Sequence, residues 1–292
     1  MSASTPGGVP RPEPAGPGAT GSASVGRGKR RTERLGPFVV FVLFIGLWYL
    51  VSGWAIDAVF GKPSFLLPPP HQVIAAGFLD NAMIRGQMFE GVWLSAQVAF
   101  LGLAIAIVVG MGLAVLMSRA RWIERSLYPY AVALQAVPIL AFVPLIGSFF
   151  GFDFTSRVLV CVIISVFPII ANTLFGLLSA EPGQHDLFTL YAASGRQRLL
   201  KLQFPAALPS IFTGLRISAG LAVIGAVVGD FFFRQGEPGI GRLIDVYRSR
   251  NDNAEMFAAV ILAAALGIAV FWLFGFLGRL AVGRWHESTG QR

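Results

Sequence analysis

Apolar runs of about twenty residues recur along this 292-residue chain, and they constrain its fold more than any other feature. Each run is long enough to cross the roughly 30 Å of hydrocarbon in a bilayer as an α-helix. Only 13% of the residues are charged and 55% are hydrophobic, which leaves too little charge to cover a soluble domain of this length. A β-barrel would show short alternating segments instead. The sequence therefore predicts an all-α, polytopic membrane protein.

Run length predicts about six transmembrane helices. The predicted spans cover about residues 37–57, 91–117, 126–150, 156–179, 211–233 and 256–280. The third span is the least regular, because Pro129, Pro138 and Pro144 interrupt its backbone hydrogen bonding. Freed backbone groups are tolerated in a bilayer only beside protein or a water-filled cavity. We therefore expect the third span to be broken or kinked.

The two ends of the chain differ in composition from its middle. Residues 1–28 are largely Pro, Gly, Ser and Ala, which cannot bury enough surface to offset the entropy of ordering the chain. We expect a disordered, basic, Pro/Gly-rich tail over 1–34, a transmembrane domain over 35–285 and a short second tail over 286–292.

The distribution of basic residues orients the spans. With the amino terminus inside, fifteen Lys and Arg residues fall on inner segments and seven on outer segments, which predicts that both termini are cytoplasmic. The net charge of +8 then reflects membrane flanks rather than affinity for nucleic acid. Two outer connections, 61–88 and 234–254, are longer than simple turns. Pro70 suits the first turn of a helix in one, and 242–249 is helix-like in the other.

The connection between the fourth and fifth spans is amphipathic and basic, and it has a helical pattern of its own. Asp186 opens this pattern, where an acid in a first helical turn complements the helix dipole. Three apolar side chains share one face at spacings of three and four residues: Leu187, Leu190 and Tyr191. Small residues over 192–195 supply a turn. A second short helix over 196–204 is expected to end where Pro205 and Pro209 break it, giving a helix–turn–helix along the inner membrane surface.

Positions in this connection match a family pattern in register. The pattern has an acidic residue six positions before a Gly and a Pro thirteen positions after that Gly; here these positions hold Asp186, Ala192 and Pro205. The chain thereby resembles the permease subunits of binding-protein-dependent ABC importers, which grip their ATPase subunits with this loop. The departures from two alanines, Gly and Leu in the family pattern are Leu187, Phe188, Ala192 and Phe204.

Three more segments resemble the nitrate/sulfonate/taurine branch of these permeases. They are LLPPPHQV after the first span, FPAALPSIFTGLRISAGLAVIGAVVGDFF at the fifth, and GEPGIGRLI after it. The resemblance covers about residues 37–285. It leaves the solute open among nitrate, alkanesulfonates, taurine and aromatic vitamin precursors such as the pyrimidine of thiamine. Phe142, Phe149 and Phe150 around the third span favour an organic solute over a bare inorganic anion.

The resemblance implies a multi-pass protein of the bacterial cytoplasmic membrane that works in an assembly. Two copies, forming a homodimer, would enclose one pathway; two ATPase subunits would dock on 186–204, and an extracytoplasmic binding protein would deliver the solute. The residues implied at the ATPase contact are Asp186, Leu187, Leu190, Tyr191, Ala192, Ser194, Gly195 and Pro205. The competing interpretation of this connection is a basic surface that binds anionic membrane lipid, which would not explain its apolar face.

No catalytic or metal-binding constellation stands out, so we expect neither enzymatic activity nor a cofactor. The three histidines lack metal-ligand spacing, the single Cys161 allows no disulfide, and no GxxxxGK[ST] phosphate loop is present. ATP hydrolysis would therefore belong to a separate subunit. An ion-coupled secondary transporter is the alternative, but it predicts a coupling carboxylate at mid-membrane, and the centres of the spans contain no Asp or Glu.

Polar residues within spans are candidates for the translocation path, because they are costly there. Gln135 lies between prolines of the third span and Asn172 follows Pro168 in the fourth. We expect these two to line the path; the alternative is that each makes a hydrogen bond that only holds the bundle together. Arg216 is expected to snorkel to the inner interface, and Asp230 is expected to pair with Arg234 one turn further on.

Cysteine labelling tests the predicted orientation. In a Cys161→Ser background, single cysteines placed at Ser64 and Ser249 should react with an impermeant thiol reagent added outside intact cells, because both positions fall on predicted outer segments. A cysteine at Ser194 should stay unlabelled. Labelling at Ser194 alone would reverse the orientation.

Overall fold

The computed structural model describes residues 26–55, 58, 61 and 64–283, and every regular element within these residues is a helix. The chain divides into two units, Met1–Leu50 and Val51–Arg292, which we describe separately. Helix α1 (Gly26–Leu50) is the regular element of the first unit. Residues 1–25 of the predicted tail over 1–34 and the whole predicted tail over 286–292 lie outside the described residues, whereas 26–34 belongs to α1.

Five described helical stretches are long and apolar enough to cross a membrane, and a bent pair of helices is a candidate for a sixth span. The five stretches are Gly36–Trp54, Ala82–Arg119 (α4), Phe154–Leu177 (α7), Gly195–Phe232 (which includes α10, Phe204–Phe232) and Asn253–Val282 (α12). The first of them ends in a π-helical turn, Val51–Ala55. The prediction of an all-α chain with about six spans is confirmed.

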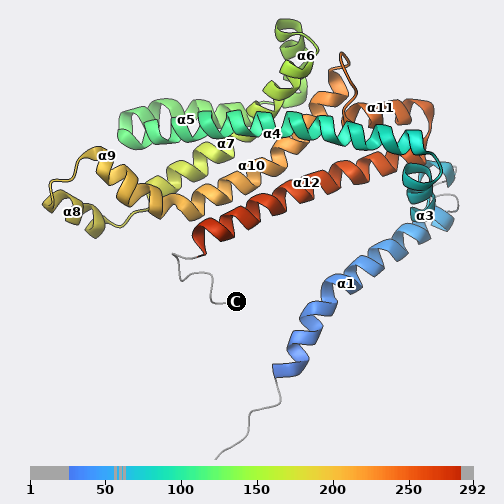
Figure 1. Cartoon of the computed structure of the whole chain (residues 1–292), viewed down its shortest axis with the longest axis horizontal. Coiled ribbons are helices and arrows are strands. Elements are labelled where there is room, and N and C mark those ends of the chain that lie inside the picture. Colours follow the sequence, from blue (N-terminus) through green and yellow to red (C-terminus); the bar gives the residue numbers. More distant parts are fainter. Residues whose placement is uncertain (1–25, 56–57, 59–60, 62–63, 284–292) are drawn as a thin grey trace, which may run out of the picture. The chain divides into compact units, whose positions relative to one another are not determined.

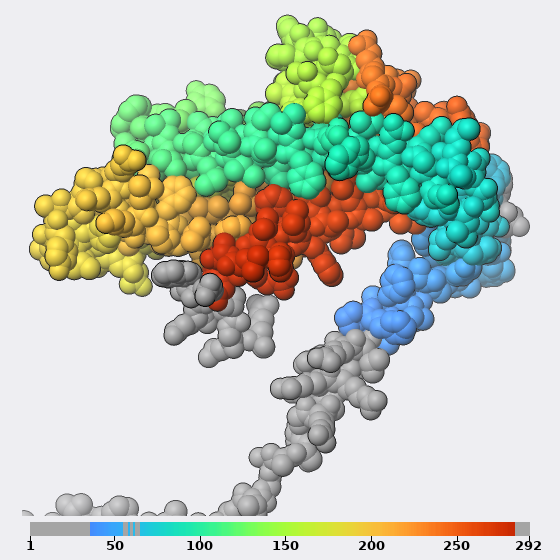
Figure 2. Space-filling view, in the orientation of Figure 1, coloured from blue at the N-terminus to red at the C-terminus, as the bar shows by residue number. Residues whose placement is uncertain are grey.

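The bent pair is the third predicted span. Helix α5 (Arg121–Ala136) and helix α6 (Ile139–Phe150) meet at an angle of 99° around Val137 and Pro138. Pro138 has no N–H to donate and disfavours a helical conformation in the residue before it, so the helix ends there. The predicted break is therefore confirmed at Pro138, whereas Pro129 and Pro144 lie inside α5 and α6. In the space-filling view, α6 stands out from the face covered by α4 (Figure 2).

Helix α7 packs against both α4 and α10, and these three contribute most of the buried core (Figure 1). Cys161 of α7 lies at the closest approach. A Cβ added to Gly225 of α10 would lie 2.9 Å from the Cα of Cys161, and one added to Gly102 of α4 would overlap its side chain. The Cys161 thiol is buried and donates to the carbonyl of Ala222 at 3.3 Å, so the cysteine acts as a small core residue.

Short elements lie at the two ends of this helix bundle (Figure 1). At one end are a 3-10 turn (Ser64–Leu66), α3 (Pro70–Ile74), a π-helical turn (Ala75–Leu79) and α11 (Ile240–Arg250). Pro70 begins α3 as predicted, and α11 covers the predicted helix at 242–249. At the other end are α8 (Pro182–Leu190), α9 (Gly195–Arg198) and a π-helical turn (Leu199–Gln203), which together we name the α8–α9 segment (182–203).

Candidate functional site

Helix α8 begins four residues earlier than the sequence pattern suggested. Glu181 is its N-cap and Pro182 its first residue, a position that suits proline because the missing N–H would have no partner there anyway. Asp186 therefore lies in the second turn, and the first turn contains no acid. The predicted interaction of Asp186 with the positive end of the helix dipole is therefore wrong. The Asp186 side chain is exposed on the surface of α8.

The turn after α8 explains the position of Ala192. The Ala193 N–H donates to the Phe188 carbonyl at 2.9 Å, and the Ala192 N–H donates to the Thr189 carbonyl at 3.0 Å. These two bonds form a Schellman motif, whose C′ residue adopts a left-handed conformation that favours glycine. Ala192 has φ of +49° and occupies that position. The family pattern, which places Gly here, therefore has a conformational reason in this chain.

Ser194 and Arg198 fix the second half of the segment. The Ser194 hydroxyl accepts from the Gln197 N–H at 3.3 Å, and the Gln197 side chain accepts from the Ser194 N–H at 2.8 Å, forming a capping box. Arg198 donates to the Thr189 hydroxyl at 2.8 Å, which links α9 back to α8. Gly195 lies beside the guanidinium of Arg119, at the end of α4. The segment thus has a defined shape rather than that of a loose loop.

The two halves of the segment present their apolar side chains in opposite ways. Leu187, Leu190 and Tyr191 on and after α8 are 50%, 84% and 80% exposed. Leu199 and Leu202 are buried instead, and Leu199 joins the main hydrophobic core. The second half therefore anchors the segment to the bundle, and the first half presents an unpaired apolar face.

The helix continues through the prolines that were expected to break it. After α9 a π-helical turn leads directly into α10, whose first residues are Phe204 and Pro205. Pro209 lies inside α10, and Gly195–Phe232 forms one continuous helical stretch. Pro205 and Pro209 each lack the N–H of one helical hydrogen bond, and the helix nevertheless continues through both. The second half of the α8–α9 segment is therefore the beginning of the fifth predicted span.

A buried polar cluster lies at the opposite end of the bundle. Arg157, in the first turns of α7, forms an ion pair with Asp230 near the end of α10, with 3.3 Å between nitrogen and oxygen. Both side chains are buried. Ser95 of α4 donates its hydroxyl to Asp230 and accepts the Ile240 N–H at 2.9 Å, at the start of α11. The carboxylate thus lies at the positive end of α11, where a negative charge is favoured.

Arg157 also binds the backbone that follows α10. Its guanidinium donates to the carbonyls of Phe233, Gln235 and Glu237 at 3.1, 2.7 and 3.1 Å. Gly239 approaches the Asp230 carboxylate so closely that a Cβ there would overlap it. The GEPGIGRLI segment therefore contains glycine where its backbone packs onto the ion pair.

Asp230 pairs with Arg157 rather than with Arg234, so the predicted pair one helical turn away is wrong. Arg234 instead pairs with Asp245 of α11 at 2.9 Å, as does Arg248 at 2.8 Å. Nearby, burial raises the pKa of Tyr247 on α11. Sequence spacing could not show that residues 157 and 230 meet, although both lie at outer ends of predicted neighbouring spans.

Helices α7 and α10 are consequently joined at both ends. The α8–α9 segment connects them covalently at one end, and the ion pair with its backbone contacts connects them at the other. Within the described residues, this is the most extensively packed pair of helices. A force on the α8–α9 segment would therefore act on α7 and α10 as one body.

The structure does not group the two predicted path residues. Gln135 is exposed on α5, next to the break at Pro138. Asn172 donates to the Pro168 carbonyl of its own helix at 2.8 Å and packs against Gly214 of α10. An apolar pocket of about 400 Å³ between α4, α5 and α7 includes neither among its lining residues. Among the residues that the structure describes, no group of three His, Cys, Asp or Glu side chains could hold a metal ion.

Comparison with known proteins places these features in a family context. The family described as "binding-protein-dependent transport system inner membrane component" matches residues 102–283. The formylaminopyrimidine transport permease protein of Halalkalibacterium halodurans is 33% identical over 243 residues, covering 83% of this chain and 93% of that protein. The riboflavin transport system permease protein of Chloroflexus aurantiacus is 33% identical over 254 residues, covering 87% and 91%.

A more distant relative and a solved structure also match most of this chain. The putative aliphatic sulfonates transport permease protein of Escherichia coli is 29% identical and covers 82% of this chain and 88% of its own length. The inward-facing MetNI methionine ABC transporter gives a TM-score of 0.61 at 17% identity, covering 69% of this chain and 99% of the matched one. That likeness concerns the fold alone.

Substitutions at the buried ion pair should affect stability far more than those at an exposed one. Arg157→Met would leave the Asp230 carboxylate buried without its partner, and we expect a loss of about 3–5 kcal/mol in the free energy of unfolding. Arg157→Met combined with Asp230→Asn should lose less than the sum of the two single changes. Thermal unfolding in detergent measures these differences.

Arg234→Met is the matched control. It breaks an ion pair whose arginine side chain is 71% exposed, so its cost should stay below about 1 kcal/mol. Equal losses for Arg157→Met and Arg234→Met would contradict a structural role of the buried pair.

Proposed function

The chain belongs to the family of binding-protein-dependent transport system inner membrane components and is the membrane-spanning permease subunit of an ATP-binding cassette importer, and we propose that its ATPase subunit docks on the α8–α9 segment. The permease forms the pathway for the solute, and ATP hydrolysis belongs to that separate subunit. We assign the contact to the residues that the family pattern implies: Asp186, Leu187, Leu190, Tyr191, Ala192, Ser194, Gly195 and Pro205.

One observation carries the docking proposal: the segment is rigidly built yet leaves its apolar face uncovered. Leu190 and Tyr191 are almost fully exposed on a short helix held by a Schellman turn, a capping box and the Arg198–Thr189 bond. Exposed apolar side chains on a fixed helix are typical of a protein contact, in which large apolar and aromatic residues supply most of the binding energy. Ser194 contributes by shaping the segment, and Pro205 lies just beyond the segment at the start of α10.

We propose that the ATPase drives transport by moving α7 and α10 together. Closure of the ATPase dimer would displace the α8–α9 segment, and the two helices joined to it would tilt as one body, because the Arg157–Asp230 pair ties their far ends. Rigid-body tilting of this kind alternates access to a site between the two sides of the membrane. An ion-coupled mechanism is disfavoured here, since Asp230 is buried and already paired with Arg157.

The remaining partners follow from the same arrangement. We propose that both termini and the α8–α9 segment are cytoplasmic, as the distribution of basic residues predicts. The end with α3 and α11 then faces outward and would receive the extracytoplasmic binding protein. A second copy of this chain would complete the pathway as a homodimer, within the lipid of the cytoplasmic membrane.

We further propose that the solute is a small organic molecule with a planar ring. The two relatives at 33% identity are named for formylaminopyrimidine and riboflavin, whereas relatives named for nitrate and sulfonates are 26–29% identical. At the end of α6, the second half of the broken span, Phe149 and Phe150 are 75% and 58% exposed, and such rings could stack on a planar solute.

Binding assays on the partner solute-binding protein test the solute class. Calorimetric titration with formylaminopyrimidine, riboflavin, nitrate and an alkanesulfonate should show at least about tenfold tighter binding of a ring compound, about 1.4 kcal/mol. Tightest binding of nitrate or the sulfonate would contradict the ring-compound proposal and leave the importer assignment intact.

Removal of the exposed apolar face should separate docking from folding. The double change Leu190→Ala and Tyr191→Ala should weaken ATPase co-purification by about thirtyfold, since contacts of this kind are typically worth about 2 kcal/mol or more. Uptake should fall in parallel. The melting temperature of the permease should stay unchanged, because neither side chain is packed in the bundle.

Met83→Ala is the control for this experiment. Met83 is 72% exposed at the opposite end of the bundle, in the first turn of α4, and its replacement should change neither co-purification nor uptake.

Asp186→Lys, which reverses an exposed charge in the proposed contact, should also reduce transport while the protein still inserts. Normal co-purification in the double variant would remove the α8–α9 segment from the docking role.

Gln135 and Asn172 remain our proposed path residues, and Gln135 allows the sharper test. Gln135 is exposed beside the break at Pro138, so Gln135→Leu should lower uptake without lowering expression if the side chain meets solute. If it only ties helices together, the same change should mainly reduce stability in detergent, by about 0.6–2 kcal/mol. Uptake and melting temperature measured on one variant distinguish the two roles.

A further inference from the structure

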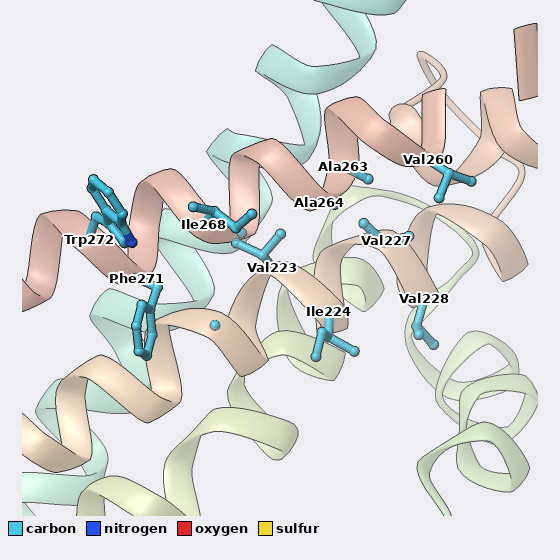
Figure 3. A pocket seen from close by; sticks show the side chains of 12 residues that line it. Val223, Ile224, Val227, Val228, Val260, Ala263, Ala264, Ile268, Phe271 and Trp272 are labelled. Carbon is cyan, nitrogen blue, oxygen red and sulfur yellow. The ribbon is translucent and has the colours of Figure 1, made fainter. Parts of the chain in front are cut away.

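An apolar groove of about 850 Å³ runs between α10 and α12 (Figure 3). Its walls are Val223, Ile224 and Val227 on α10 facing Val260 and Ile268 on α12, and Phe271 and Trp272 stand at one end. On α12 the lining extends from residue 260 to residue 272. At 1.5 Å per residue this is about 18 Å, slightly more than half the hydrocarbon thickness of a bilayer. The groove therefore has the depth of one leaflet.

The groove ends at two arginines. Arg216 and Arg279, together with Trp272 and Gly275, line an adjoining space of about 390 Å³. The guanidinium of Arg216 lies over the Phe271 ring, 3.9 Å from its centroid. Within the described residues, neither arginine forms an ion pair with a carboxylate. The predicted snorkelling role of Arg216 does not by itself account for a second arginine at the same place.

Two exposed cations at the end of an apolar groove suit an anion that carries an apolar chain. A cation within a membrane span is costly, and a single aromatic ring offsets only part of its desolvation. Basic pockets between transmembrane helices attract anionic lipid headgroups. We propose that this groove binds an anionic phospholipid, with its phosphate between Arg216 and Arg279 and one acyl chain along Val223, Val227 and Ile268.

The two arginines lie toward the end of the bundle that carries the α8–α9 segment. Arg216 lies twelve residues after the start of α10 at Phe204, and Arg279 lies three residues before the end of α12 at Val282. With that segment cytoplasmic, the lipid belongs to the inner leaflet. Only this choice of leaflet rests on the orientation proposed above, and the following experiment in detergent does not depend on it.

Glycines keep the groove open, and one of them allows it to be filled selectively. Gly220 of α10 lines the groove, and a Cβ added there would meet nothing within 4 Å. Gly220→Leu would thus place its side chain in the groove and would remove neither arginine. This variant tests the acyl-chain position independently of charge.

The test measures how phospholipid stabilises the purified permease–ATPase complex in detergent. Dioleoylphosphatidylglycerol should raise the melting temperature of the wild type, and dioleoylphosphatidylcholine should not. The apparent affinity for phosphatidylglycerol should fall about fivefold in Arg216→Gln or Arg279→Gln and about thirtyfold in the double variant. Gly220→Leu should weaken it as well. Arg121→Gln, which removes an exposed arginine elsewhere on the inner side, is the matched control and should bind like the wild type.

Three results would overturn the proposal. The first is an unchanged affinity for phosphatidylglycerol in the double arginine variant or in Gly220→Leu. The second is equal stabilisation by glycerol 3-phosphate, which would assign the arginines to a free anion. The third is loss of the second permease copy from the Gly220→Leu complex in native mass spectrometry, which would assign the groove to the partner copy. ATPase docking is scored separately by co-purification, so failure here and failure of the proposed function are distinguishable.

Discussion

The ion pair between Arg157 and Asp230 is the interaction on which the arrangement of the helix bundle depends. It lies where α4, α7, α10 and α11 meet, and it binds through Ser95 and three backbone carbonyls to each neighbouring element. A buried ion pair adds little net stability compared with apolar packing, but the loss of one partner is costly because a charge stays buried. We infer that the pair acts mainly by specifying which helix ends meet. A slip of α10 along α7 would separate the charges and their carbonyl partners together.

The Arg157–Asp230 pair also determines how a movement of the α8–α9 segment would reach the helix bundle. A helix that continued past Pro205 without support could bend, but α10 is packed along α7 and held at its far end. The Schellman turn at Ala192 and the capping box at Ser194 then fix α8 relative to α9. A partner that binds Leu190 and Tyr191 therefore acts on the whole α7–α10 pair rather than on a flexible loop. This is the physical basis for coupling an ATPase on one side of the membrane to access on the other.

The outer surfaces of the bundle have different chemistry from its core. Where α10 faces α12, the side chains are apolar over the depth of one leaflet and end in two arginines. Where α5 meets α6, the chain turns by 99°, and the far end of α6 exposes the rings of Phe149 and Phe150. The surface between α10 and α12 suits an amphiphile with an anionic head, and the exposed rings of α6 suit a planar solute. The two assignments use separate residues and are tested separately.

The sequence by itself determined the features that depend on local chemistry. Run length predicted the spans, the prolines of the third span predicted a break, and Pro70 predicted the start of α3. The spacing of Leu187, Leu190 and Tyr191 predicted an apolar helix face, which the structure leaves exposed. Only the tertiary structure decided that Asp230 pairs with Arg157 instead of Arg234, that Asn172 bonds within its own helix, and that α10 continues through Pro205. The reason is that hydropathy and spacing report the preferences of neighbouring residues, whereas the partner of a buried charge is chosen by the packing of helices that lie far apart in the chain.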